Sequence, residues 1–311
     1  MNRFVPVFIL VAVLLYPLLF RSNFAINLGV LVLFFALLGQ SWNIAGGFAG
    51  QLSFGHAVFF GVGAYASSIL QLKLGANAWI GLPAGAAAGA IVGALIAALS
   101  FRAGLRGSYF ALITLAFAEA FRILANSVGF TGGGVGLLVP LKPGVANLQL
   151  ERIGFYYLIA ALAALSIAIA IWLTRSRFGA RLAAIRENED AARALGIDTF
   201  REKVKVLALS GALAGAGGCF YAQYFLYIDP SVTFGVDKSV EMLLVAMIGG
   251  AGTVYGPLIG ALLLTLVGEW TRAVTDAQGL SLIIYGALLV AVIGFLPNGL
   301  VDAFRWRKTR A

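Results

Sequence analysis

The sequence is poor in charged residues. Only 11% of its 311 residues are Asp, Glu, Lys or Arg, whereas soluble domains carry about 25%. Residues 22–72 contain no charged residue of either sign. A water-soluble surface cannot be built from such a stretch, but the interior of a bilayer accepts it. We therefore predict an all-α polytopic membrane protein.

Cysteine and histidine are almost absent, since Cys219 and His56 are the only ones. One cysteine cannot form an internal disulfide, and this pair gives no metal-binding or thiol pattern. The sequence also lacks a nucleophile elbow, an intramembrane carboxylate dyad and a G-x4-G-K-[S/T] phosphate loop. We predict that the chain is not an enzyme and binds no metal or cofactor. Without a phosphate loop it would need a partner ATPase in order to use ATP.

The charges that are present are mainly basic, with a formal net charge of +9. A surplus of Lys and Arg in cytoplasmic loops explains this value, and anionic lipid headgroups are its natural partner. A nucleic-acid partner is therefore not expected.

Apolar runs of about 20 residues, enough to cross the hydrocarbon core, recur along the chain. We expect one transmembrane domain over 1–311. Its first run is interpreted as an uncleaved span, because no small-x-small site follows Tyr16-Pro17. The expected spans lie near 4–20, 24–45, 54–72, 78–100, 108–127, 155–174, 204–226 and 280–297.

The stretch 239–268 does not fit a single crossing. As one helix it would be about 45 Å long, against a core of about 30 Å, and Gly249-Gly250-Ala251-Gly252 interrupts it. A discontinuous helix or two short tilted segments is expected. One or two crossings both remain possible, and the basic tail 303–311 lies in the cytoplasm only with two.

One segment is rich in charged residues, unlike the rest of the chain. Residues 175–205 hold eight Lys/Arg and five Asp/Glu, and the basic residues place this charged segment in the cytoplasm. Gly196 suits the left-handed position after a helix, and Thr199-x-x-Glu202 fits a capping box that starts a second helix. Apolar residues recur before the stop at helical spacing, at Leu182, Ile185, Ala192 and Leu195.

The resulting helix–turn–helix is predicted to dock another protein. Its small crest, Ala191 and Ala192, permits close approach, and the flanking charges fix the register. An amphipathic loop on the lipid surface is the alternative, but it explains neither the interleaved acids nor the stop and restart. The candidate docking residues are Arg186, Glu187, Glu189, Asp190, Ala191, Ala192 and Gly196.

Two glycine-rich segments, one in each half of the chain, resemble each other. Residues 46–50 precede Phe54-Gly55, and residues 249–252 precede Tyr255-Gly256. Such breaks point to a pathway in repeat-built transporters, although helix packing explains glycines equally well, as for the ladder Gly85, Gly89 and Gly93. The candidate pathway residues are Gly46, Gly50, Gln51, Ser53, His56, Gly249, Gly250 and Gly252.

The polar residues beside the first glycine segment leave two roles open. Ser41, Asn43, Gln51 and Ser53 could hydrogen-bond a passing solute or satisfy the backbone of a broken helix. His56 is a candidate proton relay. No carboxylate lies near it in the sequence, so a neutral, hydrogen-bonded imidazole is the preferred interpretation.

Two opposite charges lie inside an expected span. Glu119 and Arg122 are three residues apart in 108–127 and can pair on one helix face. We expect a structural pair that faces protein or water, in preference to a gating or substrate role.

Several of these motifs resemble one family. Asp190-Ala191-Ala192-x3-Gly196 resembles the E-A-A-x3-G coupling loop of ABC importer permeases, with Asp in place of Glu and without the Ile-x-Leu-Pro that often follows. The wider run 186–197 is similar to the branched-chain amino acid permeases, LivM-type. Further motifs of this branch are Gly46-Gly47-x2-Gly50-Gln51-x-Ser53-x-Gly55-His56, Thr131-Gly132-Gly133 with Gly136-Leu137, and Met247-Ile248-Gly249-Gly250-x-Gly252-Thr253-x2-Gly256-Pro257.

The resemblance implies an ABC importer permease fold with about 8–10 transmembrane helices, in the cell inner (plasma) membrane. It implies a second homologous permease, two ATPases that bind ATP-Mg on the cytoplasmic side, and a periplasmic binding protein. The implied cargo is a branched-chain amino acid (Leu, Ile or Val), moved by alternating access when residues 186–197 transmit closure of the ATPases.

Two other functions remain open at this point. The same architecture could import urea, an amide or another small nitrogen compound. A proton- or sodium-coupled carrier could use His56 or Glu119 as its coupling group, with the charged segment as a lipid-facing loop. The sequence alone identifies neither the partner permease nor the residues that touch the substrate.

Overall fold

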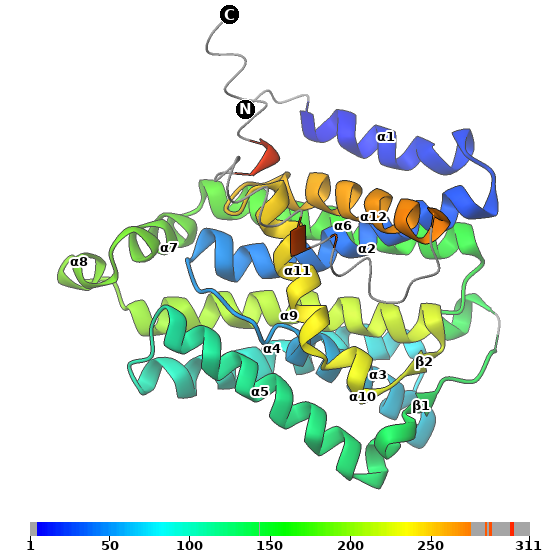
Figure 1. Cartoon of the computed structure of the whole chain (residues 1–311), viewed down its shortest axis with the longest axis horizontal. Coiled ribbons are helices and arrows are strands. Elements are labelled where there is room, and N and C mark those ends of the chain that lie inside the picture. The colour runs from blue at the N-terminus through cyan, green and yellow to red at the C-terminus, as the bar shows by residue number, and fades with distance from the viewer. Residues whose placement is uncertain (1–4, 143, 275–283, 285, 288–298, 302–311) are drawn as a thin grey trace, which may run out of the picture.

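The computed structural model describes residues 5–142, 144–274, 284, 286–287 and 299–301. Within them the chain is a bundle of long helices with one two-stranded sheet (Figure 1), which confirms the predicted all-α polytopic class. The expected span near 280–297 lies almost wholly outside the described residues, and the tail 303–311 lies entirely outside them.

Six described helices are long and apolar enough to cross a membrane, and two shorter apolar helices, Phe8–Leu19 and Gly256–Thr271, accompany them. The long helices are α2 (Asn23–Asn43, continued by a π-helical turn Ile44–Phe48), α3 (Ala57–Leu74), α4 (Ala78–Arg102), α5 (Ser108–Ser127), α6 (Arg152–Arg175) and α9 (Thr199–Phe225). The remaining α-helices are α1 (Val5–Leu19), α7 (Arg177–Glu187), α8 (Glu189–Ala194), α10 (Pro230–Thr233), α11 (Val236–Gly249) and α12 (Gly256–Val274).

The two ends of the bundle differ. At one end α7 and α8 project beyond the other helices (Figure 1). At the other end β1 (Leu137–Leu138) pairs antiparallel with β2 (Tyr227–Ile228), next to short 3-10 turns at Gly129–Thr131, Gly133–Val135 and Val145–Asn147. Because the charged segment carries the basic residues, we expect its end to be the cytoplasmic one.

Glycines bring the central helices close together. The added Cβ of an alanine at Gly89 would overlap the carbonyl of Gly211, and one at Gly215 would overlap the carbonyl of Gly85. Helices α4 and α9 therefore touch along their backbones, which confirms the packing role predicted for the α4 glycine ladder. Large fully buried side chains fill the space between α2, α3, α6 and α9, among them Trp42, Phe60, Tyr156 and Phe220.

The stretch 239–268 forms two antiparallel helices. Gly260 of α12 packs on the backbone of Val245, and Gly256 on that of Gly249, so the two helices run in opposite directions from the turn at 250–255. The stretch 239–268 therefore consists of two helical segments. Helix α11 is only 14 residues long, about 21 Å, and the short helix α10 precedes it.

Two helices begin inside the bundle. Residues 49–56 are non-helical, so α3 starts only at Ala57, whose N–H donates to Ser239 Oγ in the first turn of α11 (2.9 Å). Phe234, just before α11, packs on Gly61 of α3. The N-termini of α3 and α11 thus meet within the membrane-spanning part of the molecule.

Candidate functional site

The charged segment contains two helices before its stop, where a single one was expected. Asn188 has extended backbone (φ −159°, ψ 107°) and its Oδ1 accepts hydrogen bonds from the N–H groups of Asp190 and Ala191 (3.0 Å each). It ends α7 and caps α8. An Asn followed by two acids is typical of a helix start, and this signal is present in the sequence at residues 188–190.

The predicted stop at Gly196 is confirmed. Its φ is +83°, a left-handed conformation that favours glycine. The N–H of Gly196 donates to Arg193 O (3.0 Å) and that of Ile197 to Ala192 O (3.1 Å), which together close the end of α8.

The predicted capping box is wrong by one residue. Asp198, not Thr199, caps α9, because its side chain accepts from the N–H of Arg201 (3.0 Å). Thr199 Oγ1 instead donates to Glu189 (3.2 Å). Glu202 is buried and lies 3.5 Å from an Arg181 guanidinium nitrogen, so it joins α9 to α7.

The crest of α8 also differs from expectation. Ala192 is only 2% exposed and faces inward, so it cannot be approached by a partner. Ala191 is exposed as predicted. Leu195, which continues the helical spacing of the apolar residues, is 80% exposed at the tip. The exposed residues of α8 and its C-cap are Asp190, Ala191, Arg193, Ala194 and Leu195.

A charge network fastens α8 to the rest of the protein. Glu189 accepts from Lys203 Nζ (2.8 Å) and lies 3.6 Å from Arg106, while Asp190 bonds the same arginine (2.9 Å). Burial opposes ionisation of Glu189, but the hydrogen bond from Lys203 and the charges of Lys203 and Arg106 outweigh it and lower the pKa of this carboxyl. Through these contacts α8 is attached to α9 and to the loop between α4 and α5.

The two glycine segments meet in the structure. A Cβ at Gly47 would overlap the backbone nitrogen of Gly252. Asn43 also links the two glycine segments through its side-chain amide. Its Nδ2 donates to Thr253 O (2.9 Å), and its Oδ1 accepts from the N–H of Gly252 (2.7 Å). Such backbone proximity requires residues without a Cβ.

Arg186 connects the charged segment to both glycine segments. Its Nη1 donates to Gly47 O (3.0 Å), and its side chain lies directly against Gly50 and Gly252. Both of those glycines have left-handed backbone, with φ of +67° and +75°. The charged segment and the two glycine segments, which are predicted separately from the sequence, therefore meet at Arg186. The neighbouring Glu187 is exposed and pairs with Arg186 (3.1 Å).

The polar residues near the first glycine segment bond to backbone groups. The bonds of Asn43, Gln51 and Ser53 satisfy backbone groups of the interrupted segments, which supports that role over solute binding, whereas Ser41 bonds the regular helix α9. The bonds are Ser41 Oγ to Ser210 O (3.2 Å), Gln51 Nε2 to Ala49 O (2.9 Å), the Gly55 N–H to Ser53 Oγ (3.2 Å), and the Asn43 bonds given above.

His56 is fully buried and hydrogen-bonded. Its Nε2 lies 2.8 Å from Ser210 Oγ, which itself donates to Ser41 O (2.7 Å). Since the serine proton is used there, Nε2 is the donor of this hydrogen bond. Among the described residues no carboxylate bonds to it, and its Nδ1 has no partner there.

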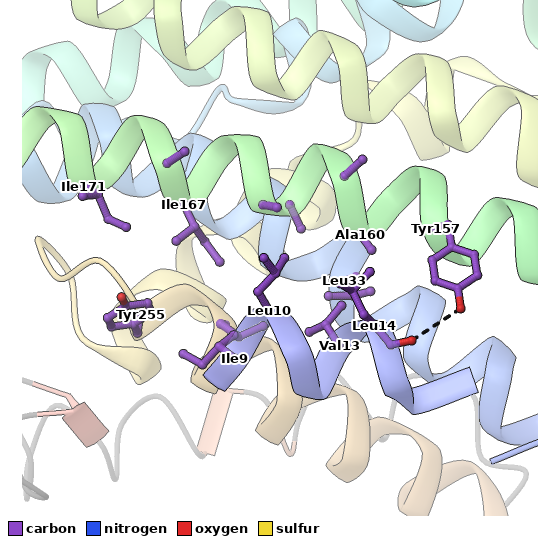
Figure 2. Close-up of a pocket in the computed structure, with 15 residues that line it drawn as sticks. Ile9, Leu10, Val13, Leu14, Leu33, Tyr157, Ala160, Ile167, Ile171 and Tyr255 are labelled. Atoms are coloured by element: carbon purple, nitrogen blue, oxygen red, sulfur yellow. Dashed lines mark hydrogen bonds between the residues drawn. The ribbon is translucent and has the colours of Figure 1, made fainter. Parts of the chain in front are cut away.

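The candidate pathway residues lie inside this chain. Gly46, Ser53, His56, Gly249 and Gly250 are buried. None of the candidates lines the cavity of about 530 Å³ between α1, α6 and Tyr255. Figure 2 shows its apolar wall, including Ile9, Leu10, Val13, Leu14, Ala160 and Ile167, with Tyr157 bonded to Leu14 O (3.4 Å) at one end.

Glu119 and Arg122 form the ion pair predicted for α5. Arg122 Nε lies 2.9 Å from Glu119 Oε2, and its Nη2 lies 2.5 Å from Oε1. The two side chains are 44% and 33% exposed on the outside of the bundle. No group of His, Cys, Asp and Glu among the described residues could hold a metal ion.

Residues 24–293 match the family described as branched-chain amino acid transport system, permease component. The chain is 29% identical to the high-affinity branched-chain amino acid transport system permease protein LivM of Escherichia coli (strain K12), over 91% of this chain and 71% of that protein. It is 23% identical to LivH of the same organism, over 86% and 91%. A probable LivM of Methanocaldococcus jannaschii is 25% identical over 64% and 61%. No solved structure matches.

Proposed function

The chain belongs to the family of branched-chain amino acid transport system permease components, and we propose that it is one of two homologous permeases of an importer for Leu, Ile and Val. It is a multi-pass protein of the inner membrane and acts with other subunits of an ABC transporter. The finer composition that we propose is a second permease, two ATPases and a periplasmic binding protein.

The contact of Arg186 with both glycine segments is the observation that carries the mechanism. Two ATPases bind ATP-Mg and close, and α8 moves with them. Arg186 then displaces Gly47 and Gly252, whose backbones touch at the two breaks. Packed backbone of this kind switches between discrete arrangements instead of deforming gradually. The path between the two permeases opens to one side and then to the other.

The ATPases dock on α8 in this proposal. Leu195 exposes an apolar side chain to the cytoplasm beside the charge of Asp190, a combination that suits a protein partner. The link from Glu189 to Lys203 and Arg106 stiffens α8, so that its motion reaches α9 and α5. ATP hydrolysis is assigned to the partner ATPases, because the sequence lacks a G-x4-G-K-[S/T] phosphate loop.

Co-isolation with the ATPases and leucine uptake test the proposal together. Asp190→Arg reverses a charge on the docking surface, and Gly196→Leu places a side chain at a φ of +83°. We expect either change to remove the ATPases from the purified complex and to abolish ATP-driven uptake. Uptake that persists without any ATPase and is lost when the proton gradient is dissipated would refute the proposal.

The cargo has its own test. The periplasmic protein encoded beside this chain should bind Leu, Ile or Val. A protein that ignores all three and binds urea or a short amide would leave the architecture standing and replace the cargo.

A further inference from the structure

The ion pair on α5 lies deep within the membrane-spanning part of the molecule. Glu119 is 11 residues from Ser108 and eight from Ser127, the two ends of the helix, and Arg122 is 14 and five residues from them. At 1.5 Å per residue these separations are about 16 and 12 Å for Glu119 and about 21 and 8 Å for Arg122. Among the described residues, the only ion pair formed by either side chain is with the other. Both remain partly exposed on the outside of the bundle.

This exposed face cannot contact lipid tails. The carboxylate of Glu119 at that depth is strongly unfavourable in hydrocarbon, so the pair faces protein or a water-filled cavity. Figure 1 shows α5 at the edge of the bundle, so in this chain alone the pair looks outward. Something other than lipid must therefore cover it in the assembled transporter.

Interrupted segments flank the same helix. The N–H of Phe54, in the non-helical stretch 49–56, donates to Thr114 Oγ1 of α5 (3.2 Å), and Phe54 is 38% exposed. Phe121 of α5 packs on Phe234, just before α11. Irregular backbone at membrane depth occurs where it is buried in protein or lines water. Thr114 and Phe121 lie about 140–160° around the helix from Glu119, so these contacts cover the inner face of α5 and leave the face of Glu119 and Arg122 outward.

The chemistry of the face matches an amino acid. A free amino acid carries one ammonium and one carboxylate, and the pair offers a carboxylate and a guanidinium at i, i+3 spacing. Leu112 and Ile123 lie on the same face as Glu119 and are 60% and 53% exposed. Ala116, between Leu112 and Glu119, is small and exposed, which leaves room beside the charges for a branched aliphatic side chain.

We propose that Glu119 and Arg122 bind the zwitterionic cargo during its passage, with Leu112, Ala116 and Ile123 contacting its side chain. The ion pair opens when the solute arrives. Glu119 then binds the ammonium of the solute, and Arg122 binds its carboxylate. Arg122 suits this because its planar guanidinium binds a carboxylate through two hydrogen bonds. The inference rests on the proposed function and adds the substrate-contacting residues to it.

Neutralising variants test the proposal in the complete transporter, reconstituted in proteoliposomes with its binding protein. A merely structural pair tolerates loss of both charges better than loss of one. Substrate binding predicts instead that Glu119→Gln, Arg122→Gln and the double variant each lower leucine uptake at least tenfold. In all three, the subunits should still co-purify and the liganded binding protein should still stimulate ATP hydrolysis.

Two outcomes of these transport and purification assays overturn this inference. The double variant could transport leucine within twofold of the wild type, which would make the pair structural. All three variants could lose the second permease, which would assign the pair to the subunit interface. Leucine uptake by the wild-type complex is measured first, because its absence would defeat the proposed function instead of this inference.

Water access gives a readout that does not depend on transport. Cys219 is fully buried, so an introduced cysteine reacts without background. Ala116→Cys should react with a charged, membrane-impermeant thiol reagent, because thiolates form only where water reaches. Leu95→Cys, on the exposed face of α4, is the lipid-facing control. An unreactive Ala116→Cys, or equal reaction at both positions, contradicts the proposal.

Discussion

Arg186 Nη1 donates a hydrogen bond to the carbonyl of Gly47, at 3.0 Å and across 139 residues of sequence. The donor lies near the end of α7, and the acceptor lies where α2 breaks. Because the same side chain also touches Gly252, one residue connects the proposed docking surface with both interrupted segments. Its loss should therefore separate ATP hydrolysis from transport.

Arg186→Ala is expected to lower leucine uptake at least fivefold while ATPase subunits remain bound and hydrolyse ATP. The physical reason is that movement of α7 no longer reaches Gly47. The measurement is the ratio of leucine transported to ATP hydrolysed in proteoliposomes. Arg177→Ala, at an exposed arginine of the same helix, is the matched control, and equal ratios in the two variants would contradict this role.

Gly47→Ala should destabilise the protein by about 1–3 kcal/mol, the usual effect of overpacking. The new methyl group would overlap backbone and the Asn43 side chain, neither of which is a flexible end. Thermal unfolding of the purified complex measures the loss. Gly129→Ala is the control, because a Cβ there meets nothing within 4 Å. Equal melting temperatures for the two variants would refute the close approach of Gly47 and Gly252.

Glu189→Gln should lower stability at neutral pH by about 1–3 kcal/mol, because Lys203 loses its charged partner. The pKa of Glu189 lies below its ordinary 4.5, so its contribution is complete above that pH and disappears as the pH falls through the lowered pKa. The difference in melting temperature between wild type and variant should be constant from pH 7 to about 5 and shrink below 4.5.

The control for this pH series is Glu187→Gln. That carboxylate is 74% exposed and pairs with another exposed group, so its removal should change stability by less than about 0.5 kcal/mol. A gap between wild type and Glu189→Gln that widens toward acid would reverse the assigned sign and refute the ionised state of Glu189.

Leu195→Asp should reduce the amount of ATPase that co-purifies at least tenfold, because a charge replaces the apolar tip of α8. Leu141→Asp is the control, since Leu141 is similarly exposed (69%, against 80% for Leu195) and lies in the connection at the other end of the bundle. Full retention of the ATPases by Leu195→Asp would move the docking surface away from this residue.

The membrane spans were predictable because length and apolar content are constraints of the bilayer itself. The expected span 204–226, for example, ends within one residue of α9. The Gly196 stop was equally clear, since a left-handed position strongly favours glycine. The family motifs led to the prediction of a docking surface in the charged segment, which stays a prediction.

Other features depended on contacts that no local pattern contains. Asp198 and Thr199 are adjacent and both good caps. The Thr199 hydroxyl instead donates a hydrogen bond to Glu189, ten residues earlier. Helix-cap patterns in the sequence do not predict a contact at that separation. Ala192 faces inward because the break at Asn188 turns α8 relative to α7. The similarity of the glycine segments suggested a shared role, but their physical contact had to be seen in three dimensions.

The bond between Asn43 and Thr253 also constrains how the protein is made. These residues are 210 positions apart, and a ribosome that adds about 5–20 residues per second needs about 10–40 s to bridge them. For that interval α2 is already synthesised while its buried amide lacks its final partner. Completion of the fold must therefore await the second half of the chain, and a protein truncated before α11 should be a substrate for membrane quality control.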